Sequence, residues 1–388
     1  MSKNNKTKNN WFRNIFSNNG KTNNLKIKKP DELSLLKDNI LTIKDLELGF
    51  TDSSDETKIN KVIRGVSLEL KKGEILSLIG ESGSGKTVLS STAFGLTGEK
   101  SVITNGTITL MNQEIQNFSQ QDWDDSKYRG QIVSAVFQNP LTTLNPTMKI
   151  KNQIMEGILN FKLSENKKEA YKIAKDLLIK TRIDNPEKVL ESYPHELSGG
   201  MKQRVVIASI IACKPKLIIM DEPTTALDPS VQADIIKIIT DLAKEFGISI
   251  IFITHDLGVV SSISDRIAIM YSGQIMEIGT ASEVIFNSQH PYTWALLSSM
   301  PDVNKGDSLE TIRGSVATNL NDVLGEAFAP RNNYAMGIDF MEEAPYTKIS
   351  ETHKVKSWLH VKDAPEFNPP ELILKRWKIF NNKYKKKK

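Results

Sequence analysis

The segment GESGSGKT, residues 80–87, constrains the fold more than any other part of this chain. It fits the pattern G-x-x-x-x-G-K-[ST], and it stands between the apolar run ILSLI and a segment with helical apolar spacing. Glycines let such a loop curl until its N–H groups point at a phosphate, and the following helix adds the positive end of its dipole. The sequence therefore predicts a phosphate-binding loop between a buried strand and a helix.

Nucleotide phosphates are the expected ligand of this loop. Lys86 is placed to reach the β- and γ-phosphates as a point charge, and the Thr87 hydroxyl is a candidate ligand of Mg²⁺. A nucleoside triphosphate and Mg²⁺ are therefore the predicted cofactors. The whole loop is a candidate for nucleotide binding: Gly80, Glu81, Ser82, Gly83, Ser84, Gly85, Lys86 and Thr87.

Two later apolar runs, LIIMDE and ISIIFITHD, end in carboxylates or histidine, as buried parallel strands often do. Asp221 is expected to hold Mg²⁺, and Glu222 to orient and deprotonate an attacking water. His255 is a candidate contact to the γ-phosphate, although a lone histidine is more often structural. Gln138, in VFQNP, follows another apolar run and is a candidate sensor of the γ-phosphate or of Mg²⁺.

The wider pattern predicts an α/β protein with a P-loop NTPase (RecA-like) core. Alternating, β-branched segments before the loop indicate an antiparallel β subdomain, and residues 150–192 have helical spacing. We expect this nucleotide-binding domain at 39–289, with an α-helical subdomain at about 139–212 that carries the segment LSGG. A small irregular C-terminal extension is expected at 290–365.

The chain is 39% hydrophobic and 25% charged, as folded proteins are, but its net charge of +5 is unevenly placed. Residues 1–30 and 373–388 each hold eight Lys or Arg and no acid, which leaves 35 basic against 46 acidic residues elsewhere. An acidic body argues against a nucleic-acid partner. The basic N-terminal extension (1–38) and C-terminal tail (366–388) are either flexible solubilising ends or contacts to an anionic membrane.

Cys213 is the only cysteine, which excludes a disulfide framework or a cysteine-based metal site within one chain and indicates a packing thiol. No apolar run approaches the ~20 residues that a membrane span needs. The first twenty residues also lack the apolar run of a secretory signal. We therefore expect a soluble or peripheral protein on the cytoplasmic side.

A second candidate anion site follows in ELSGGMKQR, residues 196–204. Ser198, Gly199 and Gly200 stand at the start of a predicted helix, where free N–H groups attract an oxygen anion. Taken alone, the tetrapeptide fits a helix start without a ligand equally well. The chain, however, carries the phosphate loop, this segment, IIMDE, ALD and ITHD in one order, and with these it resembles the nucleotide-binding subunit of an ABC transporter.

In that family the signature segment caps the γ-phosphate held by the opposite subunit of a head-to-tail dimer. The resemblance implies this role for Ser198, Gly199 and Gly200, and it places Asp228 in a loop that crosses the dimer interface. Phe50 stands where the family has an aromatic that stacks on adenine, with a core phenylalanine as the alternative. The Gln138 loop would meet the coupling helices of the membrane subunits. ATP closes such a dimer, and hydrolysis reopens it.

Longer segments narrow the resemblance to the oligopeptide/dipeptide permease ATPases, D-type. They are VFQNPLTTLNP, MDEPTTALDPSVQA, HDLGVVSSISDRIAIMYSGQIMEIGT and HPYTWALLSSMP. The resemblance implies an ATP-hydrolysing importer subunit, peripheral at the cytoplasmic face of the cell membrane and most similar to those that carry oligopeptides. Dipeptides, nickel or glutathione are alternative cargoes. Implied partners are two membrane permease subunits, a related F-type ATPase and an extracellular substrate-binding protein.

The extension departs from its family. Relatives commonly carry four cysteines there, in text resembling G-C-x-F-x-P-R-C-P and H-x-V-x-C-W. This chain has other residues at those positions: Glu326, Asn332, Asp339 and Ser357. Because an iron–sulfur cluster needs thiolates, none is expected.

Two other functions compete with transport. A soluble ABC protein of translation or DNA repair would carry two cassettes or a long coiled coil, yet only 112 positions separate Gly85 from Leu197. An ATP-sensing regulator without hydrolysis would not need both Glu222 and His255, and this chain has both.

Overall fold

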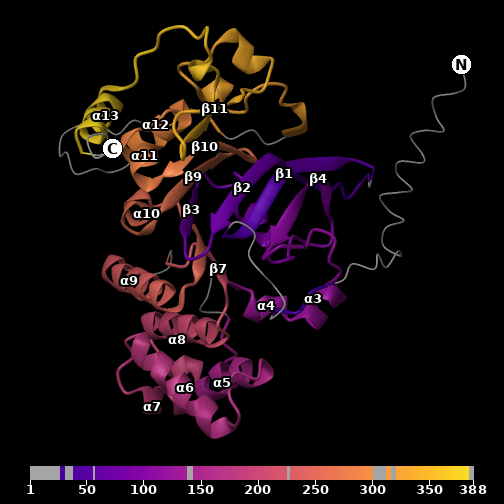
Figure 1. The fold of residues 1–388 in the computed structure, drawn as a ribbon, viewed down its shortest axis with the longest axis vertical. Coiled ribbons are helices and arrows are strands. Elements are labelled where there is room, and N and C mark those ends of the chain that lie inside the picture. The colour runs from indigo at the N-terminus through magenta and orange to yellow at the C-terminus, as the bar shows by residue number, and fades with distance from the viewer. Residues whose placement is uncertain are drawn as a thin grey trace, which may run out of the picture.

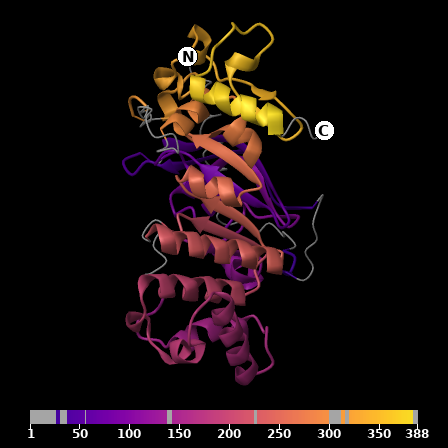
Figure 2. The same ribbon diagram turned by 90° about the vertical axis from the view of Figure 1, so that its left-hand side faces the viewer.

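The computed structural model describes residues 27–30, 38–55, 57–137, 143–224, 228–299, 312–315 and 320–383. These residues form an elongated molecule with two sheets in its middle (Figure 1). Helices occupy one end, and the C-terminal extension occupies the other. A view turned by 90° shows the same order along the long axis (Figure 2).

The larger sheet has eight strands among the described residues, in the order β11-β12-β10-β9-β3-β8-β7-β6. β9, β3, β8, β7 and β6 are parallel, while β10, β12 and β11 join with antiparallel pairing. β3, β7 and β8 are buried at every position, which explains their unbroken apolar sequence. The strand bounds are β3 (Ile75–Ile79), β6 (Val133–Val136), β7 (Leu217–Asp221), β8 (Ser249–Ile253), β9 (Arg266–Tyr271), β10 (Gln274–Thr280), β11 (Tyr346–Lys348) and β12 (Lys354–Lys356).

The smaller sheet is antiparallel, as the alternating sequence before the loop predicts, in the order β2-β1-β4-β5. One hydrophobic cluster includes side chains of both sheets, among them Leu46, Val66, Leu78 and Ile253. This shared core holds the two sheets together. The bounds are β1 (Asn39–Thr51), β2 (Ile59–Lys71), β4 (Ser101–Leu110) and β5 (Gln113–Glu114).

A helical layer covers β6–β8 and continues away from the sheet (Figure 1). In α5, Ile150, Ile154 and Ile158 are fully buried at a spacing of four, so one stripe of this helix faces the core. Cys213, just after α8, is partly buried, and burial raises the pKa of its thiol to about 11. The helices of this region are α5 (Ile150–Asn160), α6 (Lys167–Lys180), α7 (Pro186–Glu191), α8 (Gly199–Ala212) and α9 (Pro229–Phe246).

The remaining helices lie around the sheets and in the extension. Those before the helical layer are α2 (Lys86–Thr92), α3 (Gln120–Ser126) and α4 (Tyr128–Gln131). Those after it are α10 (Leu257–Ile263), α11 (Ala281–Phe286), α12 (Pro291–Ser298) and α13 (Glu371–Lys383). No described helix has both the length and the apolar character that crossing a membrane requires.

The extension is less separate from the core than the sequence suggests. Its strand β12 pairs with β10 through Glu277↔Val355 and Ile278↔Lys354, so β11 and β12 extend the main sheet. Each of these strands has three residues, too few for an alternating pattern to be visible. The extension otherwise consists of loops and short 3₁₀ helices: η5 (Leu320–Asp322), η6 (Ala329–Arg331), η7 (Gly337–Phe340) and η8 (Trp358–His360).

The basic C-terminal segment is not wholly flexible, because α13 packs against α11 and α12. Ile373 is fully buried, and Trp377 Nε1 donates to the Ser288 carbonyl oxygen at 2.9 Å. Residues 384–388, which include the last four lysines, lie outside the described residues, as do residues 1–26 of the basic N-terminal extension.

Candidate functional site

The predicted phosphate loop connects β3 to α2. Gly83 and Gly85 have φ values of 79° and 96°, which residues with a Cβ rarely adopt. Gly80 is needed for a different reason, since a Cβ there would lie 2.0 Å from the Met270 carbonyl oxygen of β9. The glycines therefore let the loop curl while its first residue packs directly against the sheet.

Lys86 begins α2, and its ammonium group lies inside the curl of the loop. Nζ donates to the carbonyl oxygens of Gly80 and Glu81, each at 2.8 Å. The residue is only 7% exposed, and burial lowers the pKa of its side chain against the opposing field of Glu222 and Asp221. A buried cation held by two carbonyls is a fixed positive charge at the centre of the loop.

Thr87 and Asp221 are brought together from α2 and the end of β7. Thr87 Oγ1 donates to Asp221 Oδ2 at 2.7 Å. Burial raises the pKa of Asp221, and the hydrogen bond from Thr87 opposes that shift. A hydroxyl beside a carboxylate supplies the oxygen ligands that Mg²⁺ prefers, so these two residues fit the predicted metal role.

Glu222 and His255 meet at the neighbouring strand ends. Glu222 Oε1 lies 3.3 Å from His255 Nδ1, and the Glu222 N–H donates to the Ile253 carbonyl oxygen of β8 at 2.9 Å. Glu222 has a φ of 47°, a left-handed conformation that costs a residue with a Cβ about 1–2 kcal/mol. The bond to β8 holds this conformation and directs the carboxylate toward His255.

The signature segment stands in the helical layer, at the start of α8. Ser198 is the N-cap of this helix: its Oγ accepts from the Met201 N–H at 3.3 Å, and its carbonyl oxygen accepts from the Lys202 N–H. A Cβ on Gly200 would lie 3.1 Å from Val231 of α9. The described hydrogen bonds of Ser198 thus remain within the first turn of α8, and none reaches this chain's own phosphate loop.

The other candidates lie in different places. Phe50 is near the end of β1, partly buried against the core that joins the sheets. Asp228 is the N-cap of α9, where its carboxylate accepts from the Val231 N–H at 3.1 Å, so it also has a structural role that the sequence analysis did not assign. Gln138 lies outside the described residues.

Carboxylates stand, in the buried part of the extension, at two of the four positions where the resemblance predicts cysteines. Glu326 is 2% exposed and its Oε1 lies 3.1 Å from His290 Nε2, while Asp339 Oδ2 accepts from the Met336 N–H at 2.6 Å. Burial and a hydrogen bond with Glu326 raise the pKa of Asp339 to about 6. Asp339 therefore takes up a proton at a higher pH than an exposed aspartate does.

The other two positions carry neutral turn-forming residues. Asn332 Oδ1 accepts from the Tyr334 N–H at 2.9 Å, and Ser357 Oγ accepts from the Leu359 N–H at 3.2 Å. None of the four residues is a thiolate, so this donor set does not fit an iron–sulfur cluster.

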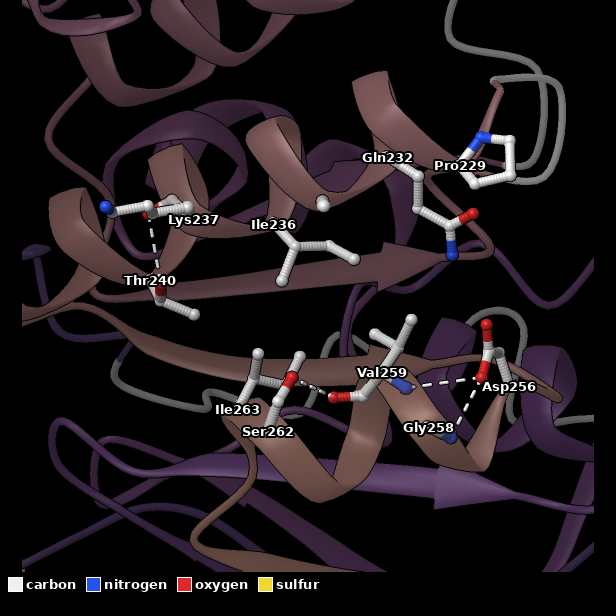
Figure 3. Close-up of a pocket in the computed structure, with 11 residues that line it drawn as sticks. Pro229, Gln232, Ile236, Lys237, Thr240, Asp256, Gly258, Val259, Ser262 and Ile263 are labelled. Carbon is white, nitrogen blue, oxygen red and sulfur yellow. Dashed lines mark hydrogen bonds between the residues drawn. The ribbon is translucent and has the colours of Figure 1, made fainter. Parts of the chain in front are cut away.

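A groove of about 490 Å³ lies between α9 and α10 (Figure 3). Ile236 of α9 and Val259 of α10 face each other across it. At one end Asp256 Oδ1 accepts from the N–H groups of Gly258 and Val259, which caps α10. None of the predicted site residues lines this groove, so it is separate from the phosphate loop.

Two side chains that the sequence analysis missed contact the phosphate loop. Tyr292 of α12 and Arg331 of the extension both hydrogen-bond to Glu81. Both residues lie more than 200 positions from the loop in the sequence, so no local sequence pattern could have predicted these contacts.

Two family models match the chain in succession. The model described as ABC transporter matches residues 63–225, and the model described as oligopeptide/dipeptide transporter, C-terminal region, matches residues 276–338. The first range includes the phosphate loop, the signature segment and both carboxylates at the end of β7. The second includes α12 and η6.

Curated relatives are similar over nearly their whole length. The dipeptide transport ATP-binding protein DppD of Lactococcus lactis subsp. cremoris is 42% identical over 345 residues, 89% of this chain and 97% of the relative. The oligopeptide transport ATP-binding protein AmiE of Streptococcus pneumoniae is 45% identical over 86% of this chain and 93% of its own. OppD of Bacillus subtilis, an oligopeptide transport ATP-binding protein, is 44% identical over 89% and 96%.

Solved structures agree with the predicted core. The structure of cbiO1 from Clostridium perfringens, part of an ABC transporter complex, gives a TM-score of 0.54 at 28% identity, covering 64% of this chain and 90% of the other. A dimeric ATP-binding cassette bound to ADP and phosphate gives 0.53 at 25% identity, covering 62% and 98%. The chain therefore belongs to the ATP-binding proteins of ABC transporters, in the group with the oligopeptide/dipeptide C-terminal region, and is an ATPase.

Proposed function

We propose that ATP is hydrolysed between the phosphate loop and the carboxyl ends of β7 and β8. The observation that carries this assignment is the pairing of side chains there: Thr87 with Asp221 at 2.7 Å, and Glu222 with His255 at 3.3 Å. Parallel strands deliver their functional residues to one edge of a sheet, and the phosphate loop begins at the same edge.

Each residue then has a distinct role. The N–H groups of the loop and the Lys86 ammonium bind the phosphates, and Thr87 and Asp221 hold Mg²⁺. Bound Mg²⁺ neutralises charge on the β- and γ-phosphate oxygens. Glu222 accepts the proton of the attacking water, and His255 orients Glu222 and contacts the γ-phosphate. We propose Gln138 as a further contact to Mg²⁺ or to the attacking water.

A second ATPase subunit completes the site. The signature residues Ser198, Gly199 and Gly200 begin α8, and the described hydrogen bonds of Ser198 stay inside that helix. We assign these three residues to the γ-phosphate of ATP held by the partner subunit and not by this chain's own loop. Asp228 then lies at the subunit interface, and Phe50 stacks on the adenine. The dimeric form of a similar ATP-binding cassette supports this assembly.

The cargo we propose is an oligopeptide. Relatives such as AmiE and OppD, each at least 44% identical, are oligopeptide transport ATP-binding proteins, while DppD is a dipeptide transport one. The partners are then two membrane permease subunits, an F-type ATPase and an extracellular substrate-binding protein. This places the chain at the cytoplasmic face of the cell membrane.

Affinity purification from membranes tests the assembly. The tagged chain should be recovered with two permease subunits and a second ATPase, and the purified complex should hydrolyse ATP faster when the substrate-binding protein and an oligopeptide are added. Recovery of the chain alone, or with translation or repair proteins, would contradict the proposal.

We also propose that the extension folds without an iron–sulfur cluster. The support is chemical, because Glu326, Asn332, Asp339 and Ser357 provide no thiolate. Purified protein should hold less than stoichiometric iron and sulfide. Iron and sulfide at cluster stoichiometry would contradict this.

A further inference from the structure

The side chain of Glu81, the second residue of the phosphate loop, is held by an arginine from the C-terminal extension. Arg331 Nη1 donates to Glu81 Oε2 at 2.7 Å, and Nη2 donates to Oε1 at 3.0 Å. The arginine side chain is 7% exposed and the glutamate side chain 25%. This is a two-pronged, charge-assisted contact of the kind that fixes geometry as well as adding binding energy.

Arg331 is itself held in place by other contacts. Its Nε donates to the Arg313 carbonyl oxygen at 2.7 Å, and Nη1 also donates to the Tyr271 hydroxyl at 3.1 Å. The guanidinium carbon lies 5.6 Å from the centre of the Tyr271 ring. The arginine therefore presents a fixed fork to Glu81.

The backbone of Glu81 is fixed from the same direction. Its N–H donates to the Tyr292 hydroxyl at 2.9 Å. Tyr292 is fully buried, and its ring packs on Tyr271 at 4.7 Å and on Phe328 of the extension at 5.1 Å between ring centres. The extension thus supports both the side chain and the backbone N–H of one loop residue.

On its other side Glu81 faces the Lys86 ammonium. Its carbonyl oxygen accepts from Lys86 Nζ at 2.8 Å and from the Ser84 N–H at 3.2 Å. A movement of Glu81 would therefore displace the carbonyl that positions the lysine and the turn that carries the inward N–H groups. A chain of contacts leads from Arg331 through Glu81 to the residue that binds phosphate.

We propose that Arg331 is a positioning residue of the phosphate loop, through which the C-terminal extension sets the affinity of this subunit for ATP. The inference rests on the proposed function, because it takes the loop to be the ATP site. Arg331 touches no phosphate; it acts through Glu81. Preorganisation of the loop lowers the cost of fixing it when ATP binds.

The test is a titration of the full-length chain with a fluorescent ATP analogue and Mg²⁺, combined with kcat and KM of the purified transporter. Arg331→Ala should raise Kd and KM for ATP about tenfold, which is about 1.4 kcal/mol, and change kcat less. Arg331→Lys should recover part of the loss, because it restores the charge but not the fork. Adding Glu81→Gln to Arg331→Ala should cost less than the sum of the single changes.

Glu343→Ala is the matched control. Glu343 also forms an ion pair between the extension and the core, with the charges reversed: this extension carboxylate pairs with the buried Arg64 of β2 and does not contact the loop. This control should leave Kd for ATP within about twofold of wild type. If Arg331→Ala does not fold, Glu81→Gln alone carries the test and should raise Kd by itself.

The inference is overturned if Arg331→Ala and Glu81→Gln both bind ATP with the wild-type Kd. It is also overturned if Glu343→Ala raises Kd for ATP as much as Arg331→Ala does. Lys86→Ala distinguishes a failure of the positioning role of Arg331 from a failure of the assignment of the loop as the ATP site. If it abolishes ATP binding while Arg331→Ala changes nothing, only the positioning role fails. If Lys86→Ala still binds ATP normally, the loop assignment fails and the positioning role with it.

Discussion

Changing Glu222 to glutamine removes the proposed base while keeping the shape of the side chain. Glu222 Oε1 lies 3.3 Å from His255 Nδ1, and a glutamine oxygen can occupy the same place. The backbone N–H of this residue still donates to the Ile253 carbonyl oxygen, which holds its left-handed conformation. The fold should therefore be unchanged, and any effect on turnover reports the lost carboxylate.

The size of the effect follows from the role. A positioned general base contributes roughly 10²–10⁴-fold, which is about 2.7–5.5 kcal/mol of transition-state free energy, so kcat should fall by that factor. ATP binding should be equal or tighter, because the charge of Glu222 acts on Lys86 and would repel a nearby phosphate.

The assay is steady-state ATP hydrolysis by the purified transporter, with nucleotide binding measured separately. Glu99→Gln, in an exposed turn, makes the same chemical change away from the site and should turn over ATP at the wild-type rate. Wild-type turnover by Glu222→Gln at saturating ATP would refute the assignment of the base.

Three further changes test other parts of the site. Gly80→Ala would place a Cβ 2.0 Å from the Met270 carbonyl oxygen. Denaturant titration should therefore show that the free energy of unfolding falls by about 1–3 kcal/mol. An unchanged free energy of unfolding would contradict the close packing of the loop against β9. Gly199→Asp should leave ATP binding by the isolated chain unchanged but impair turnover of the assembled transporter, and weaker binding by the isolated chain would contradict a role in the partner's site. Asp339 has its pKa raised from 3.8 to about 6, so its protonated form stabilises the fold below pH 3.8, and this contribution is lost as the pH rises to about 6. Asp339→Asn should therefore raise Tm by an amount that grows over that interval and then stays constant. A gain in Tm that does not depend on pH would contradict the raised pKa of this buried carboxyl.

Local sequence patterns predict the phosphate loop and the carboxylates of the site. Gly83 and Gly85 are needed for backbone conformation, and Asp221 and Glu222 follow a run that is buried on both faces. Such signals are contained in a few consecutive residues, so they can be interpreted without knowing the fold. Glu222 and His255 then meet because β7 and β8 are adjacent and parallel. Thr87 reaches Asp221 from α2, which follows β3 on the other side of β8.

Contacts between distant segments give no comparable signal. The pairing of β12 with β10 involves three-residue strands, and the sequence analysis accordingly predicts an irregular appendage where the main sheet continues. Arg331 and Glu81 are 250 positions apart. Likewise, the charge of the C-terminal segment conceals a helix whose attachment depends on Ile373 and Trp377. Tertiary packing decides each of these features.

Uptake of a labelled oligopeptide tests most directly that ATP hydrolysis by this chain drives import. The measurement compares cells whose only copy of the chain is wild type with cells that carry Glu222→Gln at equal abundance. The account predicts uptake in the first and its loss in the second, although the variant still binds ATP and still purifies with the permease subunits. Equal uptake by both would contradict it.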